Sequence, residues 1–219
     1  MFQTMDQSLM FVISAAAGVG YLFLTARPPS VLRSTIKTLC VAALALAAWT
    51  AGASGELVAA LGLCAVGDYC LSRDGERAFM AGVGAFALGH LVYVVLFLTH
   101  PLSDPTRIMT LAGGAVVVML ALVGGGMAKV LAPRAGPIAP AVLAYIPIIL
   151  AMAVSALTLP GQGSLIWAFP AAVSFMVSDL VLAVETFVLN DGHRMRRWTP
   201  YVVWPLYWGA QVGFFAAFA

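Results

Sequence analysis

Apolar residues run almost from end to end of the chain and are interrupted only by short polar stretches. A membrane helix needs about 20 mostly apolar residues, and eight stretches approach that length. They span residues 8–25, 35–52, 56–72, 79–98, 107–128, 137–159, 164–189 and 199–218. The breaks fall at turn-forming sequences such as Arg27-Pro-Pro-Ser30 and Pro160-Gly-Gln-Gly163. The pattern predicts an all-α, polytopic membrane bundle of eight transmembrane helices.

Composition supports a membrane protein with a single transmembrane domain over residues 1–219. The chain is 62% hydrophobic and only 9% charged, whereas soluble domains contain about 25% charged residues. No polar segment is long enough to separate two domains. The stretch 8–25 lacks a basic region before it and a cleavage site after it, so we expect a first membrane helix and not a signal peptide. A net charge of +2 gives no reason to expect nucleic acid, and nothing indicates a protein partner.

Basic residues predict the orientation of the bundle. Ten of the eleven Lys and Arg residues fall in or beside the first, third, fifth and seventh connections, and Arg107 alone falls in an even one. Because positively charged loops remain in the cytoplasm, the odd loops are predicted to be cytoplasmic and both termini outside. In a bacterium the host membrane would be the plasma (inner) membrane.

Two carboxylic acids lie inside apolar segments, where each costs several kcal/mol unless it is paired or functional. Asp68 lies in residues 67–71 (Gly-Asp-Tyr-Cys-Leu), and Asp179 lies in the similar residues 178–182 (Ser-Asp-Leu-Val-Leu). Each of the two Asp residues lies in the third apolar segment of its half of the chain. The match suggests a parallel four-plus-four repeat that would place the two Asp residues on facing helices. Asp68 is expected nearer the cytoplasmic surface, and for that reason easier to ionise, than Asp179.

Other polar residues are predicted to converge with both Asp residues on a cavity in the cytoplasmic half. They are Lys37, His90, Tyr145, Tyr207 and Gln211. Two carboxyl groups in different surroundings can supply one acid and one carboxylate, as acid–base hydrolysis requires. Alternatively, each Asp is a structural anchor, bound by Tyr or Ser or paired with Lys37. A metal bound by His90 and both Asp residues is a further alternative, although no metal-binding motif is present. Glu185 either lines the mouth of the cavity or pairs with the basic residues 194–197.

Short motifs in fixed order resemble a known family, the YhhN-like lysoplasmalogenases. They are Leu61–Asp68, Phe79–Tyr93, Tyr145, Phe175–Ala183 and Tyr207-Trp-Gly-Ala-Gln211. The resemblance covers residues 37–211. Thr38, Trp208 and Glu185 depart from the family pattern, which leaves the Asp, His and Gln positions intact but weakens the inference of substrate.

The resemblance implies hydrolysis of the vinyl-ether bond of a lysoplasmalogen, without cofactor or metal. Its products would be a fatty aldehyde and a glycerophospho head group. The implied partners are therefore a lysophospholipid substrate and membrane lipid. Asp68 and Asp179, with His90, are the predicted catalytic residues, and Asp179 is the favoured acid. Substrate or water would be positioned by Lys37, Tyr145, Ser178, Tyr207 and Gln211, with Lys37 or Arg196 meeting the phosphate. The rival interpretation is a small proton-coupled transporter in which both Asp residues are ion sites.

Overall fold

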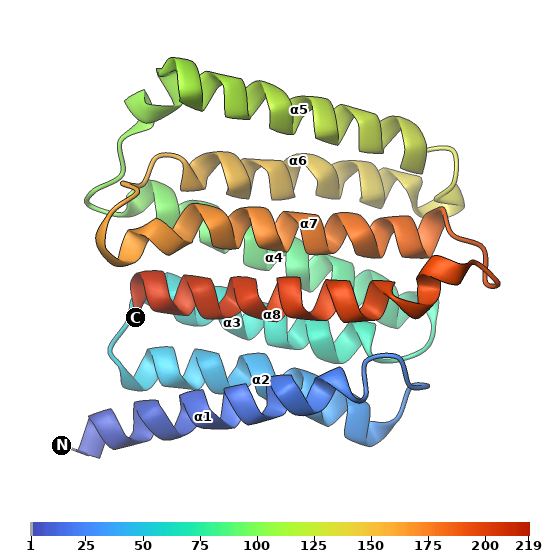
Figure 1. Cartoon of the computed structure of the whole chain (residues 1–219), viewed down its shortest axis with the longest axis horizontal. Helices are drawn as coiled ribbons and strands as arrows, with labels where there is room; N and C mark the ends of the chain where they lie inside the picture. Colours follow the sequence, from blue (N-terminus) through green and yellow to red (C-terminus); the bar gives the residue numbers. More distant parts are fainter. Residues whose placement is uncertain (1) are drawn as a thin grey trace.

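Eight α-helices form the protein in a computed structural model that describes the backbone of residues 2–219 and the side chains of residues 7–219 (Figure 1). Their bounds are α1 Phe2–Leu22, α2 Val31–Thr50, α3 Gly55–Leu71, α4 Glu76–Thr99, α5 Leu111–Leu131, α6 Ala139–Ala156, α7 Ala168–Phe187 and α8 Thr199–Phe218. Short 3₁₀ helices lie in four connections, at Pro105–Met109 (η1), Gly136–Ile138 (η2), Gly163–Trp167 (η3) and Arg194–Arg197 (η4).

The predicted all-α membrane bundle is confirmed, and each predicted segment corresponds to one helix. Among the described residues, five helical segments are long and apolar enough to span a membrane, namely α2, α4, α5, and α6 and α7 with the 3₁₀ helices that precede them. The other three lie beside them in the same bundle (Figure 1). Predicted and observed ends differ by a few residues because local hydrogen bonds set them. Helix α2, for example, starts at Val31 because the Ser30 hydroxyl accepts a hydrogen bond from the backbone N–H of Arg33.

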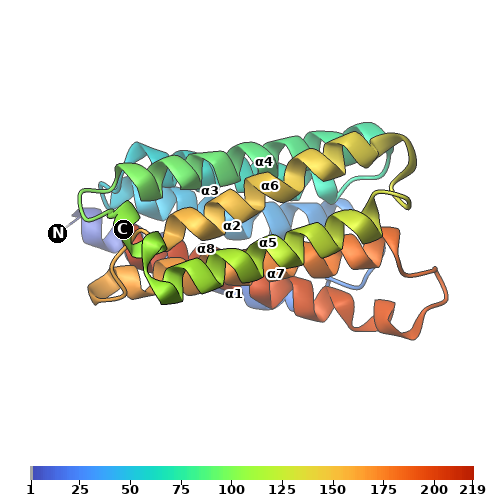
Figure 2. The same ribbon diagram turned by 90° about the horizontal axis from the view of Figure 1, so that it is seen from above.

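Successive helices run in alternating directions, and all successive pairs except α4 and α5 pack side by side, with α1 at one edge of the bundle and α5 at the opposite edge (Figures 1 and 2). Helix α4 also contacts α6, and α8 contacts α1, α2 and α3. If α1–α4 correspond to α5–α8, the α4–α6 contact corresponds to the α8–α2 contact. The packing therefore supports the predicted repeat.

Helices α3 and α4 approach closely through glycine. A Cβ atom on Gly67 would lie 2.7 Å from the ring of Phe86, and one on Gly82 would lie 2.7 Å from the Leu71 side chain. In lipid, helices associate through such close packing because there is no hydrophobic force between them. The contact fixes α3, which carries Asp68, against α4, which carries His90.

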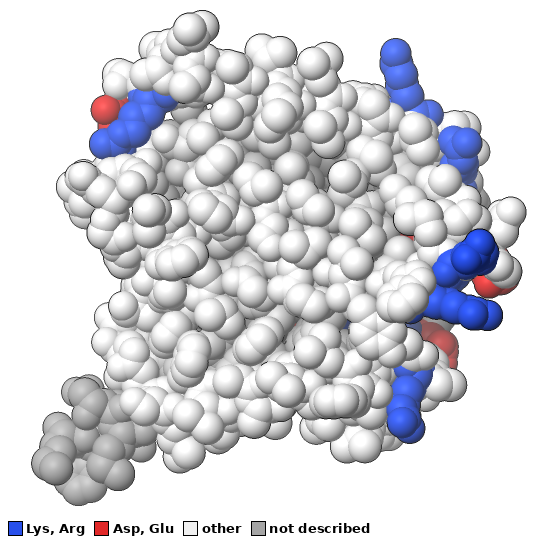
Figure 3. Space-filling view, in the orientation of Figure 1, with Lys and Arg blue, Asp and Glu red and all other residues white. Residues whose placement is uncertain are grey.

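Charged side chains gather at one end of the bundle. Figure 3 shows Lys and Arg along one end of the visible face and a single group of charged atoms at the other. The α1–α2, α3–α4, α5–α6 and α7–α8 connections meet at the first end, which we call the basic end. Arg107 lies in η1, at the other end.

Candidate functional site

A cavity of about 280 Å³ lies toward the basic end, and all eight helices contribute to its wall. Ligand pockets in proteins usually occupy about 300–1,000 Å³, so this space is close to the lower limit. Asp68, Lys37 and Tyr207 line one part, and Asp179 and Tyr145 line another. A third part is apolar and lies between α5, α6 and α7. Its residues include Val123, Gly124, Met127, Val142, Ile146, Ile149, Leu150, Leu180 and Ala183.

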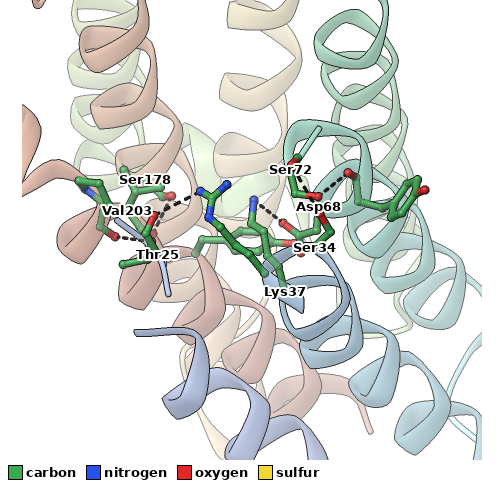
Figure 4. Close-up of polar contacts among 11 residues, drawn as sticks. Thr25, Ser34, Lys37, Asp68, Ser72, Ser178 and Val203 are labelled. Carbon is green, nitrogen blue, oxygen red and sulfur yellow. Dashed lines mark hydrogen bonds and ion pairs between the residues drawn. The ribbon is translucent and has the colours of Figure 1, made fainter. Parts of the chain in front are cut away.

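Asp68 is held by groups from α2 and α8. Its Oδ1 lies 3.0 Å from the Lys37 ammonium nitrogen, and its Oδ2 accepts a hydrogen bond of 2.7 Å from the Tyr207 hydroxyl. Figure 4 shows Lys37 reaching from its helix toward Asp68. The Asp68 side chain is fully buried, whereas 17% of the Lys37 side chain is exposed. Both carboxyl oxygens are thus occupied, and the ammonium balances the carboxylate charge.

Asp179 is held by groups from α6 and α4. Its Oδ2 accepts a hydrogen bond of 2.6 Å from the Tyr145 hydroxyl and lies 3.8 Å from Nε2 of His90. Among the described side chains, none is hydrogen-bonded to its Oδ1. With 19% of its side chain exposed, Asp179 offers an oxygen to the cavity.

His90 has a defined tautomer in its neutral form. Its Nδ1 lies 2.5 Å from the carbonyl oxygen of Phe86. Because a carbonyl only accepts, Nδ1 carries the hydrogen and Nε2 carries a lone pair. Nε2 is buried without a hydrogen-bond partner among the described residues, and it faces Asp179.

Depth along the helix and side-chain exposure rank the two acids differently. Asp68 is three residues from the end of α3, so it is the nearer to the basic end, as predicted. Its side chain is nevertheless the more buried of the two. Helices α2, α4 and α8 pack around α3 and bury the Asp68 side chain. Asp179, in contrast, is partly exposed to the cavity. Position along a helix did not predict which acid is accessible.

Two predicted site residues form hydrogen bonds to other helices of the bundle. The Ser178 hydroxyl donates to the carbonyl oxygen of Val203, which joins α7 to α8 (Figure 4). Gln211 is fully buried, accepts a 2.7 Å hydrogen bond from the Tyr93 hydroxyl and does not line the cavity. Ser178 does line it. The structure therefore brings Lys37, Tyr145, Ser178, Tyr207 and both Asp residues to the lining of one cavity, with His90 behind the lining.

The two acids have corresponding surroundings in the two halves of the chain. Asp68 on α3 is contacted from α2 and α8, and Asp179 on α7 is contacted from α6 and α4. These helices correspond if α1–α4 and α5–α8 are repeats. The predicted repeat would account for two similar carboxyl positions, which here have different partners, an ammonium in one and an imidazole in the other.

Matching residues on α4 and α8 contact each other. Phe86, His90 and Tyr93 have the same spacing as Tyr207, Gln211 and Phe214. The first pair of matching rings, Phe86 and Tyr207, has centroids 5.6 Å apart, and the last pair, Tyr93 and Phe214, has centroids 4.2 Å apart. Contact between equivalent residues is what a twofold axis between two repeats produces.

Comparison with known proteins identifies the family. The family model described as the YhhN family matches residues 32–218, which is most of the 219-residue chain. The chain belongs to the YhhN family. Comparison with curated proteins and with solved structures gave no match. At the level of the family, YhhN membership supports a hydrolase of the lysoplasmalogenase type.

The YhhN match contains every predicted site residue and excludes the whole of α1. The site is therefore built within the part of the chain that defines the family. In the part that the structure describes, no group of three or more His, Cys, Asp or Glu side chains is placed to hold a metal ion.

Sequence reasoning did not single out Arg33, which lines the same cavity of this YhhN protein. It lies one turn before Lys37 on α2, and residues four apart share a helix face. The spacing of Arg33 and Lys37 could have indicated that both residues face the site. Arg33 was counted only among the basic residues that set the orientation in the membrane. Glu185 also lines the cavity, and no described residue forms an ion pair with its carboxylate. Arg196 instead contacts Asp191 and the backbone carbonyl oxygens of Glu185 and Leu189.

Proposed function

We propose that the protein hydrolyses the vinyl-ether bond of a lysoplasmalogen, with Asp179 as the acid and Asp68 as a carboxylate. The observation that carries the proposal is the pair of acids that line one cavity and have different partners. Such a pair divides the roles of acid and base in other hydrolases of acid-labile ethers.

Charge balance distinguishes the two roles. The Lys37 ammonium, 3.0 Å from Asp68, compensates one negative charge. Asp179 has no Lys or Arg within ion-pair distance among the described side chains. A second uncompensated negative charge in a membrane interior would cost several kcal/mol. A protonated Asp179 avoids that cost.

The contacts of Asp179 determine where its proton would lie. Tyr145 donates to Oδ2, so the carboxylic hydrogen belongs on Oδ1, which accepts no hydrogen bond from a described side chain. Asp179 itself lines the cavity. From Oδ1 the proton transfers to the alkene carbon remote from the ether oxygen, which leaves an oxocarbenium ion. The carboxylates of Asp179 and Asp68 stabilise that cation.

Water completes the reaction and restores the acid. A water oxygen bonds to the carbon that carries the ether oxygen, while one water proton returns to Asp179. The resulting hemiacetal breaks its bond to the glycerol oxygen, which takes up the hydroxyl proton. The products are a fatty aldehyde and a glycerophospho head group, so the balance is one water consumed for each ether cleaved.

Aldehyde release from a 1-alkenyl lysophospholipid by the purified protein in detergent tests the proposal. We expect turnover to fall by about 10²–10⁴-fold in Asp179→Asn, the usual contribution of a general acid. Asp68→Asn should also lose turnover. Asp74→Asn is the matched control, because Asp74 is exposed in the α3–α4 turn and does not line the cavity. Full turnover in Asp179→Asn, or none in the unmodified protein, would overturn the proposal.

A further inference from the structure

The cavity wall contains one cation that no carboxylate neutralises. Arg33 lines the cavity beside Tyr21, Thr25 and Lys37. Its guanidinium donates to the backbone carbonyl oxygen of Thr25 at 3.2 Å and lies 5.8 Å from the centre of the Tyr21 ring. Its Nε is buried without a hydrogen-bond partner, and no described Asp or Glu lies within ion-pair distance. A half-buried guanidinium with an unused donor, its buried Nε, is suited to an anionic ligand.

The other basic residues nearby are already engaged. Lys37 is paired with Asp68, so an anion at Lys37 would compete with a buried carboxylate. Arg196 is bound to Asp191 and to two backbone carbonyl oxygens, and it does not line the cavity. Arg33 is therefore the cation of the wall that is available to a ligand.

Arg33 and the apolar part of the cavity belong to different sides of the bundle. Arg33 is on α2, near the α1 edge, whereas the apolar part lies between α6, α7 and α5, at the opposite edge (Figure 1). Asp68 on α3 and Asp179 on α7 also line the space that both parts share. A ligand that used both parts would need a negative group at one end and a hydrocarbon chain at the other.

We propose that Arg33 binds the phosphate of a single-chain phospholipid whose hydrocarbon chain occupies the apolar part between α5, α6 and α7. The inference rests on the proposed function and adds the residue that orients the substrate. With phosphate at Arg33 and the chain against α5, the bond between glycerol and chain lies beside the two acids. Arg33 is a positioning residue, since it contacts the phosphate and not the reacting atoms.

Binding of a non-cleavable ligand tests this orientation apart from catalysis. The probes are a radiolabelled 1-O-alkyl lysophospholipid, which lacks the vinyl group, and the matching 1-O-alkylglycerol, which lacks the phosphate. We expect Arg33→Gln to weaken binding of the phospholipid by about tenfold, the value of a charge-assisted hydrogen bond. Binding of the alkylglycerol should not change. Arg33→Lys, which retains the charge, should give an intermediate loss.

Arg27→Gln is the matched control, because Arg27 is an exposed basic residue at the same end and does not line the cavity. It should bind both probes as the unmodified protein does. Equal binding of the phospholipid by Arg33→Gln and the unmodified protein would overturn the proposal. So would an equal loss of both probes, which would indicate a general change of the cavity. Phosphate-dependent binding without aldehyde release would instead overturn the proposed hydrolysis and leave the Arg33 site standing.

Discussion

Asp68 and Asp179 occupy similar positions on α3 and α7, yet one faces a cation and the other faces an imidazole and the cavity. That difference follows from single residues on the partner helices, Lys37 on α2 and Tyr145 on α6. An ammonium compensates a fixed negative charge, whereas a phenol only donates a hydrogen bond. Two carboxyl groups of similar origin can thereby take different roles in one reaction.

The Lys37–Asp68 pair provides a stability test at the residue scale. Either Lys37→Met or Asp68→Asn alone leaves one buried group without its partner, a change that costs about 3–5 kcal/mol. In the double variant neither charge remains, so we expect most of the lost stability to return. Thermal unfolding of the four proteins in detergent measures the coupling. Additive losses in the double variant would show that the two groups do not stabilise each other.

The sequence revealed which residues of the site are costly to bury, but not their partners. Asp68, Asp179 and His90 stood out because polar groups in apolar segments need a reason. The partnership of Tyr145 with Asp179 depends on the packing of α6 against α7, which no local pattern encodes. Arg33 was missed because basic residues at helix ends also set membrane orientation, and composition does not distinguish the two uses.

At the scale of helices, the α3–α4 contact depends on the absence of a side chain at Gly67. A Cβ at that position would lie 2.7 Å from the Phe86 ring. That ring is packed against Phe175 and Tyr207, so it has little room to move. We expect Gly67→Ala to destabilise the protein by about 1–3 kcal/mol, as overpacking does. It should also lower turnover, because the Phe86 carbonyl orients His90.

Gly62 on the same helix is the control for that experiment. Nothing lies within 4 Å of a Cβ built at Gly62. Because alanine favours helix over glycine by up to about 1 kcal/mol, Gly62→Ala should unfold at the same or a higher temperature. A Gly67→Ala protein as stable as Gly62→Ala would contradict the proposed importance of this contact.

Helix α5 forms much of the apolar wall, and its residue Met127 tests whether a hydrocarbon chain lies there. Met127→Trp would fill part of the cavity. We expect turnover of long-chain 1-alkenyl lysophospholipids to fall more than turnover of short-chain ones. Met119→Trp is the control, since Met119 is on the same helix, is 55% exposed and does not line the cavity. An equal effect on all chain lengths would place the chain elsewhere.

Hydrophobic pattern was sufficient to predict the eight helices, whereas their contacts were less predictable. A run such as 79–98 is long and apolar, so its helical state in a membrane follows from the need to satisfy backbone hydrogen bonds. That helix meets α3 through the face that carries glycines such as Gly82. These glycines are spaced along the helix among other small residues. Sequence alone did not show which of them permit close packing.

The whole molecule has an uneven distribution of charge. Asp68 and Asp179 line one cavity, and that cavity lies toward the basic end. Ten of the eleven Lys and Arg residues lie in or near the connections of that end. If the positive-inside rule holds for this chain, the basic end is cytoplasmic. The substrate would then enter from the cytoplasmic leaflet.

Two single-cysteine variants test that orientation. The native residues Cys40, Cys64 and Cys70 would first be replaced by Ala. Gly192→Cys then marks the α7–α8 connection at the basic end, and Gly161→Cys marks the α6–α7 connection at the other end. Both glycines are exposed, and a Cβ at either position meets nothing within 4 Å, so both cysteines should be tolerated.

Labelling with a membrane-impermeant maleimide should then separate the two ends. We expect Gly161→Cys to react in intact cells and Gly192→Cys to react only in inverted membrane vesicles. The reason is that ten positive charges would have to be transferred across the membrane to reverse the arrangement. Labelling of Gly192→Cys in intact cells would show that the orientation is the opposite of the predicted one. The cavity would then face the outer leaflet, and its substrate would have to be a lipid supplied from that side.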